Sequence, residues 1–162
     1  MAERVAFARK GITWTVERVQ KQAFSDEVWA TGGAHTVSYV TVKEDGSDRY
    51  HIDNLTHKYS KKPAWMFHGT IVNGKKGPGI FWEKELGNIN STTYDEYILS
   101  RIEQFFREHA EEGYIFMQDN APSHRSYETR VNLHLRQIPY IKFHPYSPNL
   151  NLIEHVWNWM KN

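Results

Sequence analysis

The strongest constraint on the fold is a short apolar run that stops at an acid. Residues 114–117 (YIFM) have the pattern of a buried strand, and Gln118-Asp119-Asn120 follows directly. Open α/β sheets keep their chemistry where such strands end. We therefore expect Asp119 at the end of a buried strand, in the position of a functional side chain.

A second acid is predicted on a helix near the end of the chain. After a Ser-Pro turn at 147–148, apolar residues recur at helical spacing. These are Leu150, Ile153, Val156, Trp157 and Met160. Such a helix would hold Glu154 in a fixed direction beside a packed face. The 34 residues at 120–153 leave room for one helix and one short strand, which would return the chain to the same end of the sheet.

A third acid lies in an alternating stretch. Residues 23–30 have the pattern of a strand, in which Asp26 shares a face with Phe24 and Val28. By spacing alone, a solvated acid on an edge strand is the commoner arrangement. A member of a functional site is the alternative. Glu27 faces the other way, and we expect it to have a structural role.

The remaining segments predict an α/β fold with one mixed sheet. Its strands would form an antiparallel meander followed by parallel strands, flanked by helices. The predicted strands are 23–30, 36–42, 64–72, 80–82, 114–117 and 139–143, with a turn at 73–79. The predicted helices are a short lead-in within 2–22, one capped by Thr92 or Thr93, one from Pro122 to about Gln137 with Tyr127, Val131, Leu133 and Leu135 on its buried side, and the closing helix.

Composition limits the function classes. With 162 residues, 40% of them hydrophobic, residues 1–162 are expected to form a single domain around one core. The absence of cysteine excludes disulfides, thiolate zinc sites and thiol nucleophiles. We find no signal peptide and no apolar run of about 20 residues, so we expect an intracellular protein without a membrane partner.

A nucleic-acid partner would need a local basic patch, because the net charge is only +1. The candidates for phosphate contact are Lys58, Lys61, Lys62, Lys75 and Lys76. A solvated loop is the alternative interpretation of these lysines. Nine histidines invite a zinc site, but the chain has no HExxH motif, and zinc is not favoured.

Asp26, Asp119 and Glu154 together suggest metal chemistry. Magnesium prefers oxygen ligands and keeps several waters, so two or three carboxylates and a substrate phosphate complete a site. Clustered carboxylates also raise one another's pKa unless a cation is present. We therefore expect a site that depends on a divalent metal.

The residues around the three acids resemble a known family. The motifs FSDE (24–27), QDNAPSH (118–124) and SPNLNLIEHVW (147–157) are similar to the catalytic domain of the transposon superfamily that includes mariner, the DDE superfamily endonucleases. The 34-residue gap also resembles the branch whose third acid is Glu. Asn149 and Leu152 replace the Asp and Pro that are usual in the third motif, and neither is one of the acids.

The resemblance implies an RNase H-like fold, two Mg²⁺ ions (or Mn²⁺), and DNA strand cleavage followed by strand transfer. Asp26 and Asp119 would share one metal, and Glu154 would complete the second site. Asn120 and His124 would lie near the site, where they orient a carboxylate or touch DNA. The alternatives are a turn amide for Asn120 and a solvent-facing residue at a helix start for His124.

The resemblance also implies partners and a location. Family members carry a helix-turn-helix region before the catalytic domain and continue beyond the third acid. We therefore expect this chain to be a catalytic domain that lacks the first and is truncated at its C-terminus. DNA would be the partner, in the nucleus, with a homodimer formed by the full-length protein. Two alternatives stay open: a domesticated or inactive DNA- or protein-binding module, and a host nuclease that only cleaves.

Overall fold

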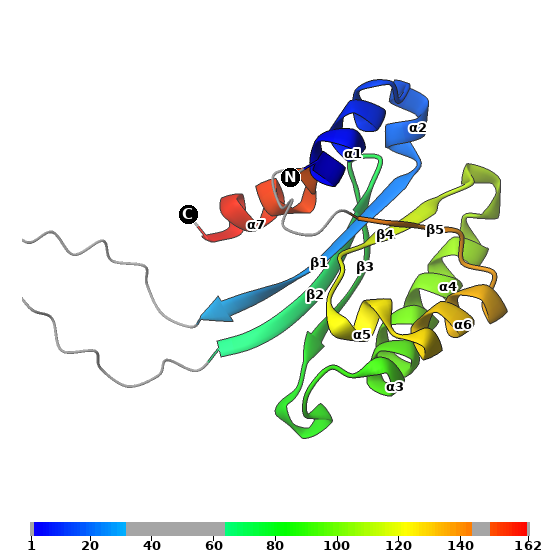
Figure 1. The fold of residues 1–162 in the computed structure, drawn as a ribbon. Helices are drawn as coiled ribbons and strands as arrows, with labels where there is room; N and C mark the ends of the chain where they lie inside the picture. Colours follow the sequence, from blue (N-terminus) through cyan, green and yellow to red (C-terminus); the bar gives the residue numbers. More distant parts are fainter. Residues whose placement is uncertain (1, 32–63, 144–149, 162) are drawn as a thin grey trace, which may run out of the picture.

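The computed structural model describes residues 2–31, 64–143 and 150–161. They form a five-stranded sheet in the order β3-β2-β1-β4-β5, with helices on both faces (Figure 1). The strands are β1 (Gln22–Thr31), β2 (Ala64–Val72), β3 (Lys75–Trp82), β4 (Ile115–Gln118) and β5 (Tyr140–Lys142). β1, β2 and β3 pair antiparallel, whereas β4 and β5 pair parallel on the other side of β1. The predicted mixed sheet is confirmed.

Helices and helical turns connect these strands. They are α1 (Ala2–Ile12), α2 (Val16–Gln20), η2 (Lys84–Leu86), α3 (Ser91–Thr93), η3 (Tyr94–Leu99), α4 (Ser100–Glu108), η4 (Ala110–Glu112), α5 (Pro122–Arg125), α6 (Tyr127–Leu135) and α7 (Ile153–Lys161). Within the described ranges, none is long and apolar enough to cross a membrane. In Figure 1, α1 and α7 lie on one side of the sheet, and α3, α4 and α6 lie on the other.

Each face of the sheet has its own core. Side chains from η3, α4 and α6 cover one face, in a cluster formed by Ala23, Val72, Trp82, Tyr94, Ile98, Leu99, Ile102, Tyr114, Phe116, Leu133 and Ile138. The other face packs against α7, in a cluster formed by Phe24, Val28, Met117, Phe143, Ile153 and Trp157. β1 is the central strand and contributes to both cores. The alternative that Asp26 is an edge-strand acid is therefore wrong.

The predicted turn at 73–79 is wrong, because β3 already begins at Lys75. Only Asn73 and Gly74 form the turn, with φ of 50° and 70°. Glycines and Pro78 made the following residues look like a loop. Proline is tolerated here because β3 is an edge strand, where its missing N–H faces no partner.

The predicted helix at 122–137 is interrupted at Ser126. This residue has extended backbone angles (φ −58°, ψ 155°), and its hydroxyl caps α6 by accepting from the Thr129 N–H at 3.0 Å. The break changes which side of α6 is buried: Leu133 is inside as predicted, but Tyr127 and Leu135 are exposed. Met160, predicted on the apolar stripe of the closing helix, is exposed as well. The strand predicted at 36–42 lies outside the described residues.

The cap of the helix that follows β3 is Asn90, not Thr92 or Thr93. The Asn90 side chain accepts from the Thr93 N–H, and the Thr93 hydroxyl accepts from the Asn90 N–H, both at 3.0 Å. We expect Asn90→Ala to lower the free energy of unfolding by about 1 kcal/mol, because the Thr93 N–H at the helix start loses its side-chain acceptor. Urea denaturation measures this loss. Asn90→Asp keeps the acceptor and should retain most of the stability; equal losses in both variants would contradict the capping role.

Candidate active site

Asp26 lies in the middle of β1, opposite Gly69 of β2. Burial raises the pKa of Asp26 to about 7, and the negative charges of Glu27, Glu154 and Asp119 add to this shift. The Glu27 N–H opposes it by donating to Asp26 Oδ1 at 2.8 Å. The fold thus brings the other two predicted acids close enough to act on the charge of Asp26.

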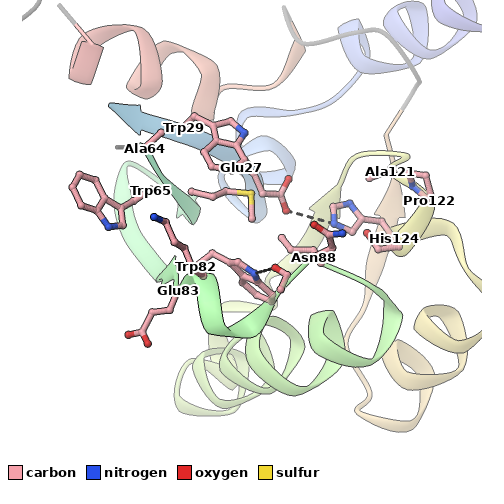
Figure 2. Close-up of a pocket in the computed structure, with 15 residues that line it drawn as sticks. Glu27, Trp29, Ala64, Trp65, Trp82, Glu83, Asn88, Ala121, Pro122 and His124 are labelled. Atoms are coloured by element: carbon pink, nitrogen blue, oxygen red, sulfur yellow. Dashed lines mark hydrogen bonds and ion pairs between the residues drawn. The ribbon is translucent and has the colours of Figure 1, made fainter. Parts of the chain in front are cut away.

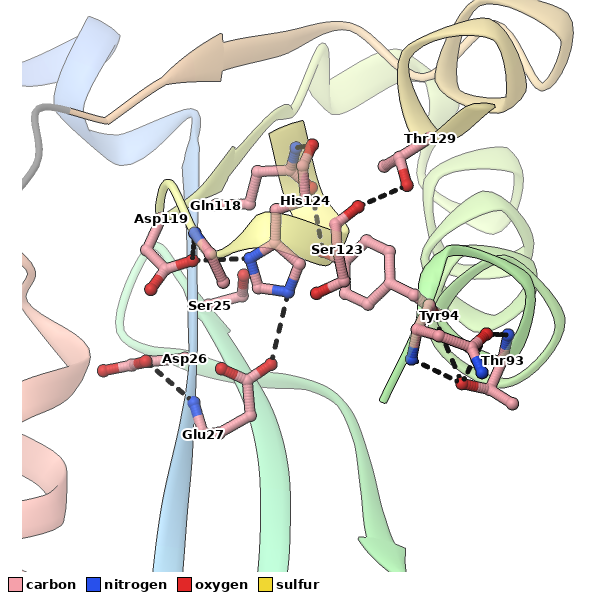
Figure 3. Close-up of polar contacts among 12 residues, drawn as sticks. Ser25, Asp26, Glu27, Thr93, Tyr94, Gln118, Asp119, Ser123, His124 and Thr129 are labelled. Carbon is pink, nitrogen blue, oxygen red and sulfur yellow. Dashed lines mark hydrogen bonds and ion pairs between the residues drawn. The ribbon is translucent and has the colours of Figure 1, made fainter. Parts of the chain in front are cut away.

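Asp119 directly follows β4, as predicted. β1 and β4 are parallel, with Phe24 beside Met117, so two further residues along each strand bring Asp26 and Asp119 to the same level. Figure 3 shows both carboxylates on the same side of β1. The Asp119 side chain is 45% exposed, which leaves room for a ligand.

One oxygen of Asp119 is held by the protein. Oδ1 accepts from the Ala121 N–H at 2.8 Å and lies 2.5 Å from His124 Nδ1. Burial alone would raise the pKa of Asp119, but the hydrogen bond and charge of His124 lower it below the usual value. Asp119 is therefore an ionised, oriented carboxylate.

Glu154 lies in the first turn of α7. Ile153 and Trp157, on either side of it in sequence, are buried and fix the helix against the sheet. Just before the helix, the Asn151 side chain donates to the carbonyl of Ser25 at 3.2 Å. This bond joins the start of α7 to the backbone next to Asp26, so the third acid is positioned by packing and by one buried hydrogen bond.

His124 links the acid site to the opposite face of the sheet. Its ring is only 4% exposed, and its Nε2 lies 3.5 Å from Glu27 Oε1 (Figure 3). Burial would lower the pKa of His124, but Asp119 and Glu27 together raise it to about 9. His124 is therefore a buried cation between two carboxylates. The solvent-facing alternative is wrong, and the near-site prediction agrees with its position.

A second layer of polar side chains holds His124. The Tyr94 hydroxyl donates to Gln118 Oε1 at 2.8 Å, and the Gln118 amide donates to the carbonyl of His124 at 3.0 Å. The ring centroids of Tyr94 and His124 are 4.2 Å apart. Tyr94 begins η3, a π-helical stretch, and such stretches are rare and frequent near functional sites. His68, opposite Glu27 on β2, is buried, and burial lowers its pKa to about 4, so it is neutral.

The other predicted site residues have varied outcomes. The Asn120 amide donates to the carbonyl of Phe143, which ties the loop after β4 to the end of β5 and supports the turn-amide interpretation. Lys75 and Lys76 are exposed beside the β2–β3 turn, and their contact with DNA stays a prediction. Lys58, Lys61 and Lys62 lie outside the described residues.

Sequence reasoning missed four residues of this network: Glu27 as a partner of His124, and His68, Tyr94 and Gln118. Glu27 was predicted on the face opposite Asp26, which is correct, but its partner His124 comes from α5, about a hundred residues later in the chain. The available signal was a second acid directly after Asp26 on a strand that is buried on both faces. Such an acid needs a counter-charge.

The donor chemistry of the acids fits a hard divalent cation, because Asp26 and Asp119 supply carboxylate oxygens. A cation would also offset both the burial of the Asp26 charge, which is the main cause of its raised pKa, and the repulsion by neighbouring acids that adds to it. In the ranges that the structure describes, however, no three His, Cys, Asp or Glu side chains are gathered so that they could hold one metal ion. Ligation by Asp26 and Asp119 together, and by Glu154, therefore stays a prediction.

The pKa of His124 predicts a pH dependence of stability without metal. Its folded-state pKa is raised from 6.5 to about 9, so the bound proton stabilises the fold below pH 6.5, and this contribution is lost as pH rises through about 9. We expect His124→Gln to be less stable than the parent at about pH 6, with the difference shrinking steadily towards about pH 9. Urea denaturation in chelator-containing buffer measures it. A difference independent of pH would show that only packing of the ring matters.

Comparison with known proteins shows the family to which this chain is similar. The model of the DDE superfamily endonuclease matches residues 24–162. The transposable element Tc1 transposase of Caenorhabditis elegans is 27% identical over 162 residues, which cover 95% of this chain and 55% of that protein. The Tc3 transposase of the same organism is 33% identical over 86 residues, or 49% of this chain and 26% of that protein. The chain thus spans about half the length of the Tc1 relative.

Solved structures agree on the fold. The Mos1 transposase paired-end complex with left transposon end superposes with a TM-score of 0.68 at 17% identity, over 97% of this chain and 45% of that chain. The catalytic domain of Mos1 mariner transposase superposes with a TM-score of 0.59 at 16% identity, over 96% and 64%. The fold is RNase H-like, as the sequence predicted. With the family model matching most of its length, this chain belongs to the DDE superfamily endonuclease family.

Proposed function

We propose that this chain carries out metal-dependent DNA strand cleavage and strand transfer, as the catalytic domain of a transposase. The observation that carries the proposal is the placement of the acids: Asp26 on the central strand and Asp119 just past β4 lie at the same level of the sheet, and Glu154 lies in the first turn of α7, which packs on the same face. Clustering three acids costs stability unless a cation binds them. The Mg and the Mn in solved structures of the Mos1 catalytic domain with Raltegravir support the same chemistry.

In this proposal each residue has a defined role. Asp26 and Asp119 would together bind one divalent ion, and Glu154 would complete the site for a second. Bound divalent ions would activate the attacking oxygen and stabilise the leaving oxygen of the phosphodiester. His124 acts as a positioning residue, because it holds one oxygen of Asp119 and leaves the other for a ligand. Glu27 keeps His124 protonated and in place.

The proposal includes the partners and the location. A transposase end complex among the structural neighbours supports transposon-end DNA as the substrate. Pairing of two ends would require a homodimer of the full-length protein, and chromosomal DNA as the target implies a nuclear location. Sequence-specific recognition of the ends would come from a helix-turn-helix region outside this chain.

Plasmid nicking tests the proposal. Supercoiled DNA is incubated with the purified chain and Mg²⁺ or Mn²⁺, and the parent is compared with Asp119→Asn. We expect nicked and linear products from the parent and none from the variant. Glu111→Gln, which changes an exposed acid in η4 at the opposite end of β4 from Asp119, is the matched control and should cleave like the parent.

The same assay separates the alternatives. DNA that is bound but not cut by the parent, with either metal, would favour the binding module over the enzyme. Cleavage without joining of a pre-cut end to a target plasmid would favour a nuclease that only cleaves. Equal cleavage by the parent and Asp119→Asn would overturn the proposed site.

A further inference from the structure

An ion pair outside the acid site ends beside a residue that supports His124. Arg136 directly follows α6, and its guanidinium binds the Asp95 carboxylate through two hydrogen bonds, from Nε at 2.8 Å and from Nη2 at 3.0 Å. A two-point contact of this kind fixes the orientation of both groups as well as their separation. Asp95 is the residue after Tyr94 in η3, so the contact holds the backbone next to the Tyr94 ring.

This ion pair is largely shielded from solvent. The side chains of Arg136 and Asp95 are 25% and 23% exposed, and a partly buried pair is screened by salt much less than a surface pair. Arg136 also donates to Glu103 of α4. Of these two acceptors, only Asp95 adjoins a residue of the His124 network, so the same guanidinium makes one contact towards the site and one away from it.

The helical register of η3 decides where Tyr94 points. η3 is π-helical, and the N–H of Ser100 donates to the carbonyl of Asp95, five residues earlier. Relaxation to an α-helix would move the first residues of η3 by one position, which is a rotation of about 100°. Tyr94 would then turn away from His124. Arg136 opposes this rotation, because it holds Asp95 from another helix.

His124 depends on support from Tyr94, because its other surroundings are open. Residues 121–124 line a cavity of about 630 Å³, which Figure 2 shows beside His124. On the side of η3, the Tyr94 ring lies 4.2 Å from the His124 ring, and Gln118 hydrogen-bonds both residues. A displaced Tyr94 would therefore let the imidazole move towards the cavity and away from Asp119.

The chain that carries Arg136 also carries His124. α6 begins two residues after α5, and the Thr129 hydroxyl in α6 donates to the Ser123 carbonyl in α5 at 2.6 Å. The first turn of α6 is thus tied to the segment of His124, and its C-terminal end is tied to η3. These contacts close a ring of covalent and hydrogen bonds around the histidine.

We propose that Arg136 is a positioning residue for the active site. It holds Asp95, and thereby the ring of Tyr94. That ring in turn holds His124 against Asp119, so that one carboxylate oxygen stays oriented and the other stays available. The proposal rests on the proposed function, in which Asp119 binds a divalent ion. A purely structural clamp between α6 and α4 is the competing role for Arg136.

NMR of the metal-free chain with isotope-labelled histidine tests the proposal without cleavage. His124 Nδ1 lies 2.5 Å from Asp119 Oδ1, so its proton should be protected from water and shifted downfield. The signal is identified by its absence from His124→Gln. We expect Arg136→Gln and Asp95→Asn to shift it or to lose it to exchange with water. Glu103→Gln, which removes the other acceptor of Arg136, is the matched control and should leave it unchanged.

Urea denaturation separates positioning from stability. Asp95→Asn and Glu103→Gln each remove one charged acceptor from the same guanidinium, so both should lower stability, but only the first should change the His124 signal. An unchanged signal in Asp95→Asn overturns the proposal. A signal that changes in both variants, in proportion to the stability lost, overturns it in favour of the structural clamp.

Plasmid nicking extends the test to the reaction. We expect Arg136→Gln and Asp95→Asn to cut about tenfold more slowly than the parent, because a small displacement of a catalytic group is costly. The double variant should be no slower than either single variant, since the two residues form one contact. Parental rates in both single variants overturn the proposal. If the parent cuts no DNA, the proposed function fails, and the NMR comparison alone decides whether Arg136 positions His124.

Discussion

We expect Asp26→Asn to abolish DNA cleavage and, at the same time, to make the metal-free protein more stable. Loss of a charged ligand should reduce the cleavage rate at least about a thousandfold, since several kcal/mol of transition-state stabilisation depend on the ion it binds. The gain in stability follows from burial. The pKa of Asp26 is about 7, so its ionised form is disfavoured in the fold, and asparagine resembles the protonated acid.

The sign and the pH window of this effect follow from the shift. Because the folded-state pKa is raised from 3.8 to about 7, protonation stabilises the fold below pH 3.8, and that contribution is lost as pH rises through about 7. Below about pH 3.8, Asp26→Asn should therefore have the same free energy of unfolding as the parent. At about pH 8 its free energy of unfolding should be higher by roughly 1–2 kcal/mol, after discounting for the partial exposure of Asp26.

Thermal unfolding with and without Mn²⁺ provides the measurement. Mn²⁺ should raise the melting temperature of the parent, because it binds the folded state, but should have little effect on Asp26→Asn. Glu111→Gln should behave as the parent in both conditions. A variant that is less stable than the parent at every pH would mean that the Asp26 carboxylate is a structural hydrogen-bond acceptor and not a strained ligand.

We expect Gly69→Ala to destabilise the fold by about 1–3 kcal/mol and to reduce cleavage as well. A Cβ at Gly69 would lie 2.6 Å from Trp157 Cη2 and 2.9 Å from Phe67 Cε1. Trp157 is 3% exposed and belongs to the core beneath α7, so its ring has little room to retreat. The helix must shift, and Glu154 shifts with it.

Urea denaturation and plasmid nicking measure the two effects of Gly69→Ala. Gly11→Ala is the control: a Cβ there meets nothing within 4 Å, and alanine in a helix should leave stability unchanged or raise it by up to about 1 kcal/mol. Trp157→Leu gives a second check, since it makes space for the new methyl group. If Gly69→Ala costs as much in that background as in the parent, the clash with Trp157 is not the cause.

Local patterns predicted the main elements well. Alternation in 23–30 and the apolar run before Asp119 identified β1 and β4. The reason is that strand side chains alternate between two faces, so the burial of each face appears directly in the local sequence. Helical spacing around Glu154 identified α7 for the same reason. These signals are contained within about ten residues, and each was confirmed as an element.

Features that depend on distant pairing could not be predicted. Pro78 looks like a turn residue until the sheet order shows that it lies on an edge strand. The contact between Glu27 and His124 needs β1 and β4 to be parallel neighbours, which no local pattern states. Tyr94 reaches His124 from a π-helical stretch whose spacing differs from that of an α-helix.

The alternation of β1 places two adjacent acids in two different layers of the protein. Asp26 belongs to the layer of α7, and Glu27 to the layer of Tyr94 and His124. An insertion or deletion of one residue in β1 before Asp26 would exchange the faces of the two acids, because the side chains from that point on would reverse relative to those before it. The first half of β1 therefore has a length that is fixed in its parity: a change by one residue would place Glu27 in the layer of α7 and Asp26 in the layer of His124.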